Sequence, residues 1–94
     1  MNGSLPTQTM YYFVYVLLSL KDTRFYIGFS TNVEARLKDH LNGRNISTAQ
    51  RRPFELVYYE AFRSKQDALR REKYFKTTKG KTTLRQMLRD DLQA

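Results

Sequence analysis

The sequence predicts an α/β (α+β) domain: a small three-stranded antiparallel sheet flanked by helices, in the order ββαβαα. Two runs of aromatic and β-branched residues stand close together near the start, and a third stands in the middle of the chain. Two segments with helical periodicity and capping residues separate or follow these runs. A chain of 94 residues has room for one core, so we expect one domain over residues 10–94.

The first run, YYFVYVLL over residues 11–18, is apolar on both alternating faces. This pattern is typical of a central strand that is covered on both sides. The polar stretch SLKDTR then supplies a turn, and FYIGF over residues 25–29 returns as a second strand. The third strand is predicted over residues 54–62 (FELVYYEAF).

A first helix is predicted between a Thr31-x-x-Glu34 capping box and a C-terminal stop at Asn42-Gly43. Residues 44–53 form a basic loop without periodicity. Ser64 is expected to cap a second helix that runs through residue 76. After a hinge at residues 79–80, a third short helix is expected over residues 82–92.

Composition excludes several classes of protein. Without cysteine there is no disulfide and no thiolate zinc site, and the single histidine excludes a multi-histidine metal site. Residues 1–9 are polar and read as a disordered leader, without the features of a signal peptide. No apolar run approaches the roughly 18 residues of a membrane span. We therefore expect a cytoplasmic protein with no membrane partner.

Positive charge favours nucleic acid as the partner. The chain has 17 Lys and Arg against 9 Asp and Glu, a formal charge of +8. On so small a surface this excess favours phosphate backbones over acidic macromolecules. The alternative is that a small domain is basic merely for solubility.

The predicted hairpin brings two tyrosines onto adjacent strands, Tyr15 and Tyr26. Tyrosine is common in strands, so each also has an ordinary structural interpretation. Gly28 is more informative, because glycine weakens a strand and permits close approach of another group. The alternative for Gly28 is a β-bulge.

Polar residues also fall within the apolar stripes of both predicted helices. On the first helix Arg36 and His40 share a stripe with Leu37, so they look toward the core side. The alternative interpretation of Arg36 is a side chain whose stem packs on the core while its charged head reaches water, and that of His40 is a histidine hydrogen-bonded at the surface. On the second helix Glu72 lies in the stripe, where a carboxylate is costly unless paired. The alternative interpretation of Glu72 is an ordinary exposed ion pair with Lys76.

Together these residues resemble the motifs of the GIY-YIG nuclease superfamily, in particular its small stand-alone, UPF0213-like members. Residues 13–15 (FVY) stand in the GIY place, and residues 26–28 (YIG) match the second half letter for letter. The family's arginine, the following histidine and its glutamate correspond to Arg36, His40 and Glu72. The resemblance covers residues 11 to about 88.

The resemblance implies a metal-dependent endonuclease that hydrolyses phosphodiester bonds in DNA, as in DNA repair, with one Mg²⁺ (or Mn²⁺) ion. Glu72 would bind the ion, and Tyr15 would accept the proton of the attacking water while Tyr26 orients the network. Arg36 would hold the phosphate, and His40 would be an auxiliary hydrogen-bond donor or acid.

A set of basic residues outside these motifs is predicted to bind the nucleic-acid backbone: Arg44, Arg51, Arg52, Lys76, Lys79 and Lys81. Nothing in this set encodes base readout, so recognition should be selective for structure or single strands rather than for sequence. DNA is the favoured substrate, RNA the alternative, and a monomer is expected.

The sequence departs from the family pattern in two places. Phe13 stands where the motif's name has glycine, and no asparagine occurs beyond Asn45, whereas many members carry one after the glutamate. This keeps a second interpretation open: a non-catalytic nucleic-acid-binding module with a degenerate nuclease site. A third, a basic protein-interaction domain, explains the charge but not the motif residues together.

Overall fold

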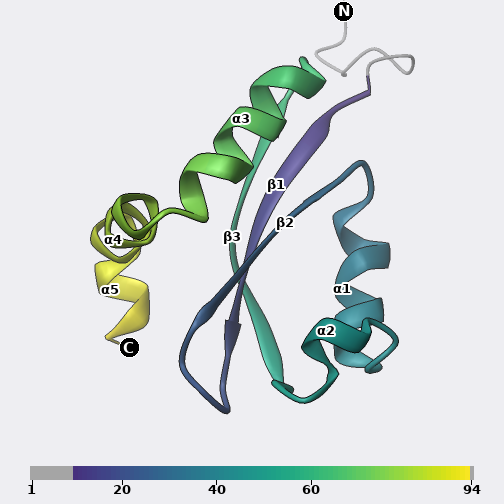
Figure 1. Ribbon diagram of the computed structural model, residues 1–94, viewed down its shortest axis with the longest axis vertical. Coiled ribbons are helices and arrows are strands. Elements are labelled where there is room, and N and C mark those ends of the chain that lie inside the picture. Colours follow the sequence, from purple (N-terminus) through teal and green to yellow (C-terminus); the bar gives the residue numbers. More distant parts are fainter. Residues whose placement is uncertain (1–9, 94) are drawn as a thin grey trace, which may run out of the picture.

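The computed structural model describes residues 10–93, so the predicted leader over residues 1–9 lies outside the described residues. The strands are β1 (Tyr12–Ser19), β2 (Phe25–Ser30) and β3 (Phe54–Phe62) (Figure 1). The helices are α1 (Val33–Leu41), α2 (Ile46–Ala49), α3 (Lys65–Phe75), α4 (Thr78–Met87) and α5 (Arg89–Leu92). The predicted fold class is confirmed, with the two four-residue helices α2 and α5 added to the ββαβαα order.

The sheet has the order β2-β1-β3, and both pairs of strands are antiparallel. The strand predicted to be central is therefore central, which explains why it is apolar on both faces. Its pairing with β2 is continuous, whereas the pairing with β3 shifts between Val16 and Leu17, where β3 carries one extra residue, Val57. This bulge shifts the alternation of side chains along β3 by one residue. Leu56 and Tyr58, two residues apart, therefore point to different faces of the sheet.

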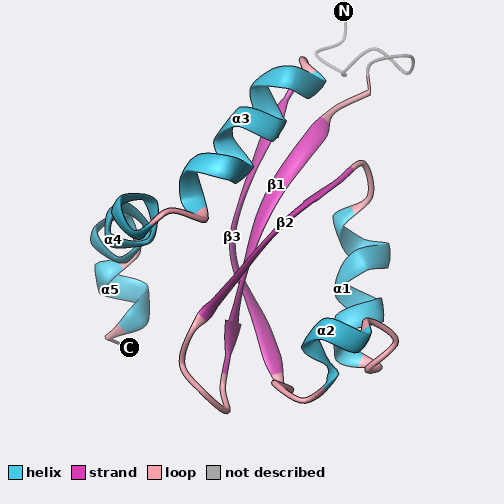
Figure 2. Cartoon of the chain, viewed as in Figure 1, coloured by secondary structure: helices cyan, strands magenta, loops and turns pink. Residues whose placement is uncertain are grey.

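Helices cover both faces of the sheet (Figure 2). On one face α3 and α4 bury the apolar cluster around Val14, Val16 and Phe75. On the other face α1 and α2 cover a smaller cluster around Tyr15 and Leu17. Alternation along β1 thus sends neighbouring residues into two separate cores.

The first helix begins one residue later than predicted. Asn32 is the N-cap, and its side-chain oxygen accepts a hydrogen bond from the Ala35 amide at 3.0 Å. The Thr31 capping box was therefore wrong, because asparagine caps at least as well as threonine and stood next to it. The predicted stop is confirmed, with Asn42 as C-cap and Gly43 at a φ of 73°. Ser64 caps α3 as predicted.

The predicted hinge at residues 79–80 is wrong. Helix α4 begins at Thr78, capped by Thr77, and Gly80 is buried in its first turns. A Cβ on Gly80 would stand 2.0 Å from the carbonyl oxygen of Tyr74, so the glycine serves the close approach of α4 to the end of α3. Within residues 10–93, no helix has both the length and the apolar character needed to cross a membrane.

Candidate active site

A buried chain of hydrogen bonds joins Tyr15 of β1 to His40 of α1 and Thr48 of α2, the helices that cover one face of the sheet. The Tyr15 hydroxyl lies 3.0 Å from Nε2 of His40, and Nδ1 of the same ring lies 2.8 Å from the Thr48 hydroxyl. Tyr15 and Thr48 are each 1% exposed and His40 is fully buried. Buried polar groups are costly unless satisfied, and here each one is.

The histidine is thus not the surface histidine of the alternative interpretation. Burial lowers the pKa of His40 below its usual value, and Arg36 lowers it further against an opposing contribution from Asp39. The ring is therefore neutral near pH 7, with one nitrogen able to accept a proton.

Gly28 makes room for the tyrosine of this chain. It stands opposite Tyr15 in the β1–β2 ladder, and a Cβ at position 28 would lie 2.3 Å from the Tyr15 hydroxyl oxygen. The predicted close approach is therefore that of the Tyr15 side chain, and the continuous pairing excludes a bulge at this place. Any larger residue would displace the hydroxyl from His40.

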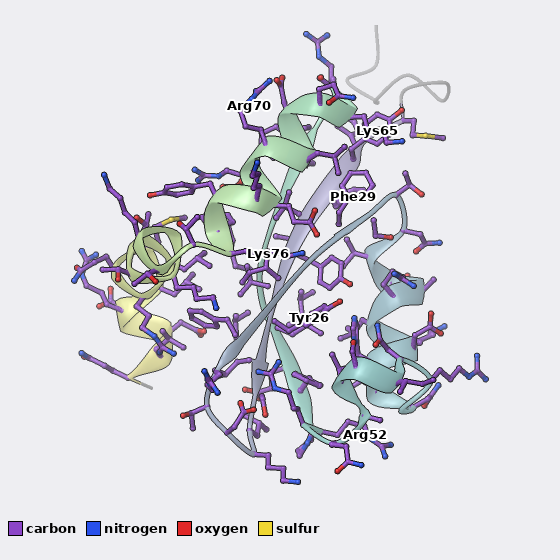
Figure 3. All side chains as sticks on the ribbon, viewed as in Figure 1. Tyr26, Phe29, Arg52, Lys65, Arg70 and Lys76 are labelled. Carbon is purple, nitrogen blue, oxygen red and sulfur yellow. The ribbon has the colours of Figure 1, made fainter. Side chains whose placement is uncertain are left out.

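Tyr26 completes an aromatic group drawn from three elements. Its ring centre lies 6.3 Å from that of Tyr15 and 4.7 Å from that of His40. Unlike Tyr15, Tyr26 is only partly buried. Figure 3 labels Tyr26, which is the second residue of β2, and Lys76, which is the C-cap of α3.

Two further predicted residues act on the Tyr15 hydroxyl electrostatically. Burial raises the pKa of Tyr15 to about 12, with Tyr26 and Glu72 adding to the rise and Arg36 opposing it. The Arg36 side chain is 47% exposed, and its Nη1 lies 3.9 Å from Asp39. The guanidinium is therefore near the hydroxyl yet open to a ligand.

Glu72 enters from α3, on the other face of the sheet. Its side chain is only 19% exposed, and Oε2 lies 3.2 Å from Nζ of Lys76 one turn later. The ion pair of the alternative interpretation therefore forms. It is not an ordinary exposed pair, however, because the Glu72 side chain is mostly buried and its charge helps to raise the pKa of Tyr15.

A family model described as GIY-YIG catalytic domain matches residues 11–86. The chain belongs to the GIY-YIG family, which is a family of nucleases. The match includes every residue of the buried chain described above, as well as Tyr26, Arg36 and Glu72.

Relatives of this GIY-YIG chain bear UPF0213 names. UPF0213 protein SH2523 of Staphylococcus haemolyticus is 46% identical over 67 residues, which cover 70% of this chain and 80% of that protein. A UPF0213 protein of Lacticaseibacillus paracasei is 46% identical over 69 residues, covering 72% and 76%. The solution NMR structure of UPF0213 protein BH0048 from Bacillus halodurans matches with a TM-score of 0.53 at 37% identity, covering 83% and 85%.

Nucleases of the GIY-YIG family generally use a divalent metal ion, and the residues here fit one held by few protein ligands. Within residues 10–93, no group of three or more His, Asp or Glu side chains is placed to bind a metal. Among the described residues, Glu72 is the carboxylate whose charge contributes to the raised pKa of Tyr15. Mg²⁺ commonly keeps several waters and binds through one or two carboxylates plus substrate phosphates, which suits a single glutamate.

The six cations predicted to bind the backbone are not equivalent in this GIY-YIG domain. Arg51 is held by Asp22, with Nε 2.7 Å from Oδ2. Arg52 donates from Nε to the Ala49 carbonyl at 2.9 Å but stays exposed.

The others are more accessible. The Arg44 side chain is 74% exposed, near Asp39. Lys76 pairs with Glu72, while Lys79 and Lys81 lie exposed on α4. The structure does not gather the six into one cluster.

Thr48 was missed by the sequence analysis. It lies in α2, within the segment predicted to be an irregular loop, and its only sequence signal is its place eight residues after His40. Two further arginines near Arg51, Arg24 and Arg85, were also missed and are considered below.

Proposed function

We propose that this protein is a metal-dependent endonuclease that hydrolyses phosphodiester bonds in DNA. The observation that carries the proposal is the buried Tyr15–His40–Thr48 chain, which ends at a hydroxyl influenced by both Arg36 and Glu72. A hydroxyl hydrogen-bonded to a neutral base, beside a cation and a carboxylate, is an arrangement suited to activating water at a phosphate.

The raised pKa of Tyr15 decides how the tyrosine acts. With a pKa of about 12, keeping it ionised at pH 7 would cost about 7 kcal/mol, so it is not a standing phenolate. Instead, the Tyr15 oxygen takes a proton from the attacking water as its own proton passes to Nε2 of His40. The water oxygen forms its bond to phosphorus while the bond to the leaving oxygen breaks, and the leaving oxygen takes a proton from solvent.

Thr48 sets the tautomer that this transfer needs. Its hydroxyl lies 3.4 Å from the Asn45 carbonyl, which can only accept, so Thr48 is free to accept from Nδ1–H of His40. The proton on Nδ1 leaves the lone pair on Nε2, facing Tyr15. Thr48 is thus a positioning residue, and His40 is a proton acceptor rather than the auxiliary acid that the resemblance implied.

Arg36 and Glu72 take the remaining roles. The half-exposed guanidinium of Arg36 binds the phosphoryl oxygens. Glu72 would hold the divalent ion, Mg²⁺ or Mn²⁺, which would supply charge neutralisation at the phosphate. In the absence of that ion Lys76 balances the carboxylate. The substrate is recognised by shape or as a single strand, by a monomer in the cytoplasm.

A specific observation favours the second candidate, a non-catalytic nucleic-acid-binding module. The Glu72 carboxylate already has a counter-ion in Lys76, and no asparagine follows it. A carboxylate neutralised in this way could simply stabilise α3.

The deciding experiment is a cleavage assay on single-stranded, duplex, flapped and branched DNA, and on RNA of the same sequence. Mg²⁺, Mn²⁺ and EDTA are compared. Native protein should cleave with metal only, and Glu72→Gln should lose on the order of 10²-fold or more in rate while remaining folded. Glu34→Gln, at an exposed position on α1, is the matched control and should cleave normally. Binding without cleavage on every substrate would favour the second candidate.

A further inference from the structure

A basic pocket of about 380 Å³ lies where the β1–β2 turn, the segment before β3 and helix α4 meet. Four of its lining residues are cations and one is a carboxylate, so positive charges exceed negative by three. In Figure 1 the β1–β2 turn and the start of β3 lie together at the bottom of the view. The lining residues are Asp22, Arg24, Phe25, Arg51, Lys81 and Arg85.

Arg51 is fixed on one side of this pocket. Its Nε and Nη2 bond to Asp22 at 2.7 and 3.3 Å, and Nη2 also donates to the carbonyls of Arg24 and Phe25 at 3.2 and 3.4 Å. The bonds that Asp22 accepts from Arg51, and after them the bond that it accepts from the Arg24 amide at 2.9 Å, hold the pKa of Asp22 well below its usual range. The carboxylate is therefore already engaged and opposes an incoming anion less.

Arg85 is fixed on the other side. Its guanidinium carbon lies 4.6 Å from the centre of the Phe25 ring, and Nη2 donates to the Thr23 carbonyl at 3.2 Å. Among the described residues, neither Arg51 nor Arg85 uses Nη1 in a hydrogen bond. Both guanidiniums thus keep N–H groups for a ligand at little further cost in side-chain entropy.

The two remaining cations, Arg24 and Lys81, are exposed and form no ion pair within residues 10–93. Fixed guanidiniums match the oxygens of a phosphate, and mobile cations beside them add charge. The geometry therefore points to a phosphate group as the ligand.

The pocket lies along the same edge of the sheet as the candidate active site. Phe25 and Tyr26 are neighbours in β2, an edge strand, so their side chains point to opposite faces. A nucleic acid lying across this edge reaches both places. We infer that the pocket binds a backbone phosphate of the substrate, other than the phosphate that is cleaved. This inference rests on the proposed function.

The first test measures binding in EDTA, where no cleavage interferes, with a fluorescein-labelled single-stranded oligonucleotide. Arg24→Gln with Lys81→Gln should weaken binding roughly tenfold at low salt and flatten the slope of log K against log salt by about one unit. Both residues are exposed, so the fold should survive. The control pair, Arg63→Gln with Lys65→Gln, removes the same charge at the far end of α3 (Lys65 in Figure 3). Equal losses in the two pairs would overturn the inference.

A second measurement separates backbone phosphate from free phosphate. Amide NMR shifts of residues 22–25, 51, 81 and 85 are followed during titration with the oligonucleotide, and separately with inorganic phosphate. The oligonucleotide should shift them saturably, and inorganic phosphate at equal phosphate concentration should not. Saturation by inorganic phosphate alone would make the pocket a small-anion site and overturn the inference. Neither measurement depends on cleavage, so a failure of this inference is distinguishable from a failure of the proposed endonuclease function, which the cleavage assay tests.

Discussion

Two tyrosines on opposite faces of the sheet have the same acidity and different partners. Burial raises the pKa of both Tyr15 and Tyr58 to about 12. The Tyr15 hydroxyl meets Nε2 of His40 at 3.0 Å, whereas the Tyr58 hydroxyl donates to Glu60 at 2.6 Å. The raised pKa alone therefore does not mark a catalytic tyrosine.

The partner is what separates them. Glu60 also accepts two hydrogen bonds from Arg71, at 2.8 and 2.9 Å, and the guanidinium lies 4.3 Å from the centre of the Phe75 ring. Burial opposes ionisation of Glu60, but the bonds from Arg71 and Tyr58 outweigh it and lower its pKa. Both oxygens of the Glu60 carboxylate are already bonded by Arg71, so we expect this network to be structural. The His40 ring is instead neutral and is bonded by two hydroxyl groups, those of Tyr15 and Thr48.

The largest expected effect comes from removing each hydroxyl in turn. Tyr15→Phe should lower the cleavage rate by about 10²- to 10⁴-fold, because the proton relay loses its first member. Tyr58→Phe should leave the rate within about threefold and instead lower stability by about 1–3 kcal/mol, since Glu60 loses a partly buried hydrogen-bond donor. Single-turnover rates and urea unfolding measure both. Equal losses of rate in the two variants would remove the distinction drawn here.

Two glycines offer the next comparison, one on each face. Gly28→Ala places a methyl group 2.3 Å from the Tyr15 hydroxyl oxygen, and Gly80→Ala places one 2.0 Å from the Tyr74 carbonyl oxygen. Each should cost about 1–3 kcal/mol of stability. Only Gly28→Ala should also abolish cleavage by the folded fraction, because it moves Tyr15 away from His40. Cleavage is measured at a temperature where both variants are folded, and normal cleavage by Gly28→Ala would contradict the relay.

A smaller effect is expected at Thr48. Thr48→Val should slow cleavage about tenfold, or about 1.4 kcal/mol in barrier, because His40 loses the acceptor that fixes its tautomer. Thr48→Ser should restore the rate. The ¹⁵N shifts of the ring should show Nδ1 protonated in native protein and a tautomer mixture in Thr48→Val. Thr83→Val is the control, since the Thr83 hydroxyl lies on the other face, where it donates to the Lys79 carbonyl at 3.0 Å and lies 2.8 Å from the Tyr74 hydroxyl. A native tautomer in Thr48→Val would remove the proposed role of Thr48.

Local patterns were enough to predict the sheet. The three strands were placed within one residue at each end, because dense aromatic and β-branched runs bounded by polar turns have few alternatives. Helix ends were less predictable where neighbouring residues compete to cap, as Thr31 and Asn32 do. Gly80 was read as a break, whereas its role is set by the packing of α4 against α3, which no local pattern contains.

In the candidate site, too, the motif residues were predictable from the sequence, whereas the partners of each group were not. The motif residues Tyr15, Tyr26 and His40 do meet, and Arg36 and Glu72 lie near enough to influence the Tyr15 hydroxyl. Their catalytic roles stay predictions. Which partner each group has was not predictable, because these contacts join elements far apart in the chain. Thr48 is one example, and the pairing of Arg51 with Asp22 is another.

The smallest expected effect is a change in alkaline stability, which should have the same direction for the two tyrosines. Burial raises the pKa of each in the folded protein to about 12, whereas a tyrosine in the unfolded chain has a pKa of 10.0. A raised pKa contributes stability that is complete below pH 10 and is lost as the pH rises through about 12, because the unfolded chain releases its protons first. Native protein should therefore lose up to about 1 kcal/mol of stability per pH unit for each tyrosine, and less for Tyr58, which is more accessible to solvent.

Urea unfolding between pH 9 and 11 measures this loss, because the pH range lies around the pKa of an unfolded tyrosine and below the raised value of about 12. The free energy of unfolding should fall less steeply with pH in Tyr15→Phe and in Tyr58→Phe than in native protein. If Tyr15→Phe declined as steeply as native protein, the Tyr15 pKa would not be raised in the folded state. The tyrosine could then ionise directly, and the proposed transfer to His40 would lose its reason.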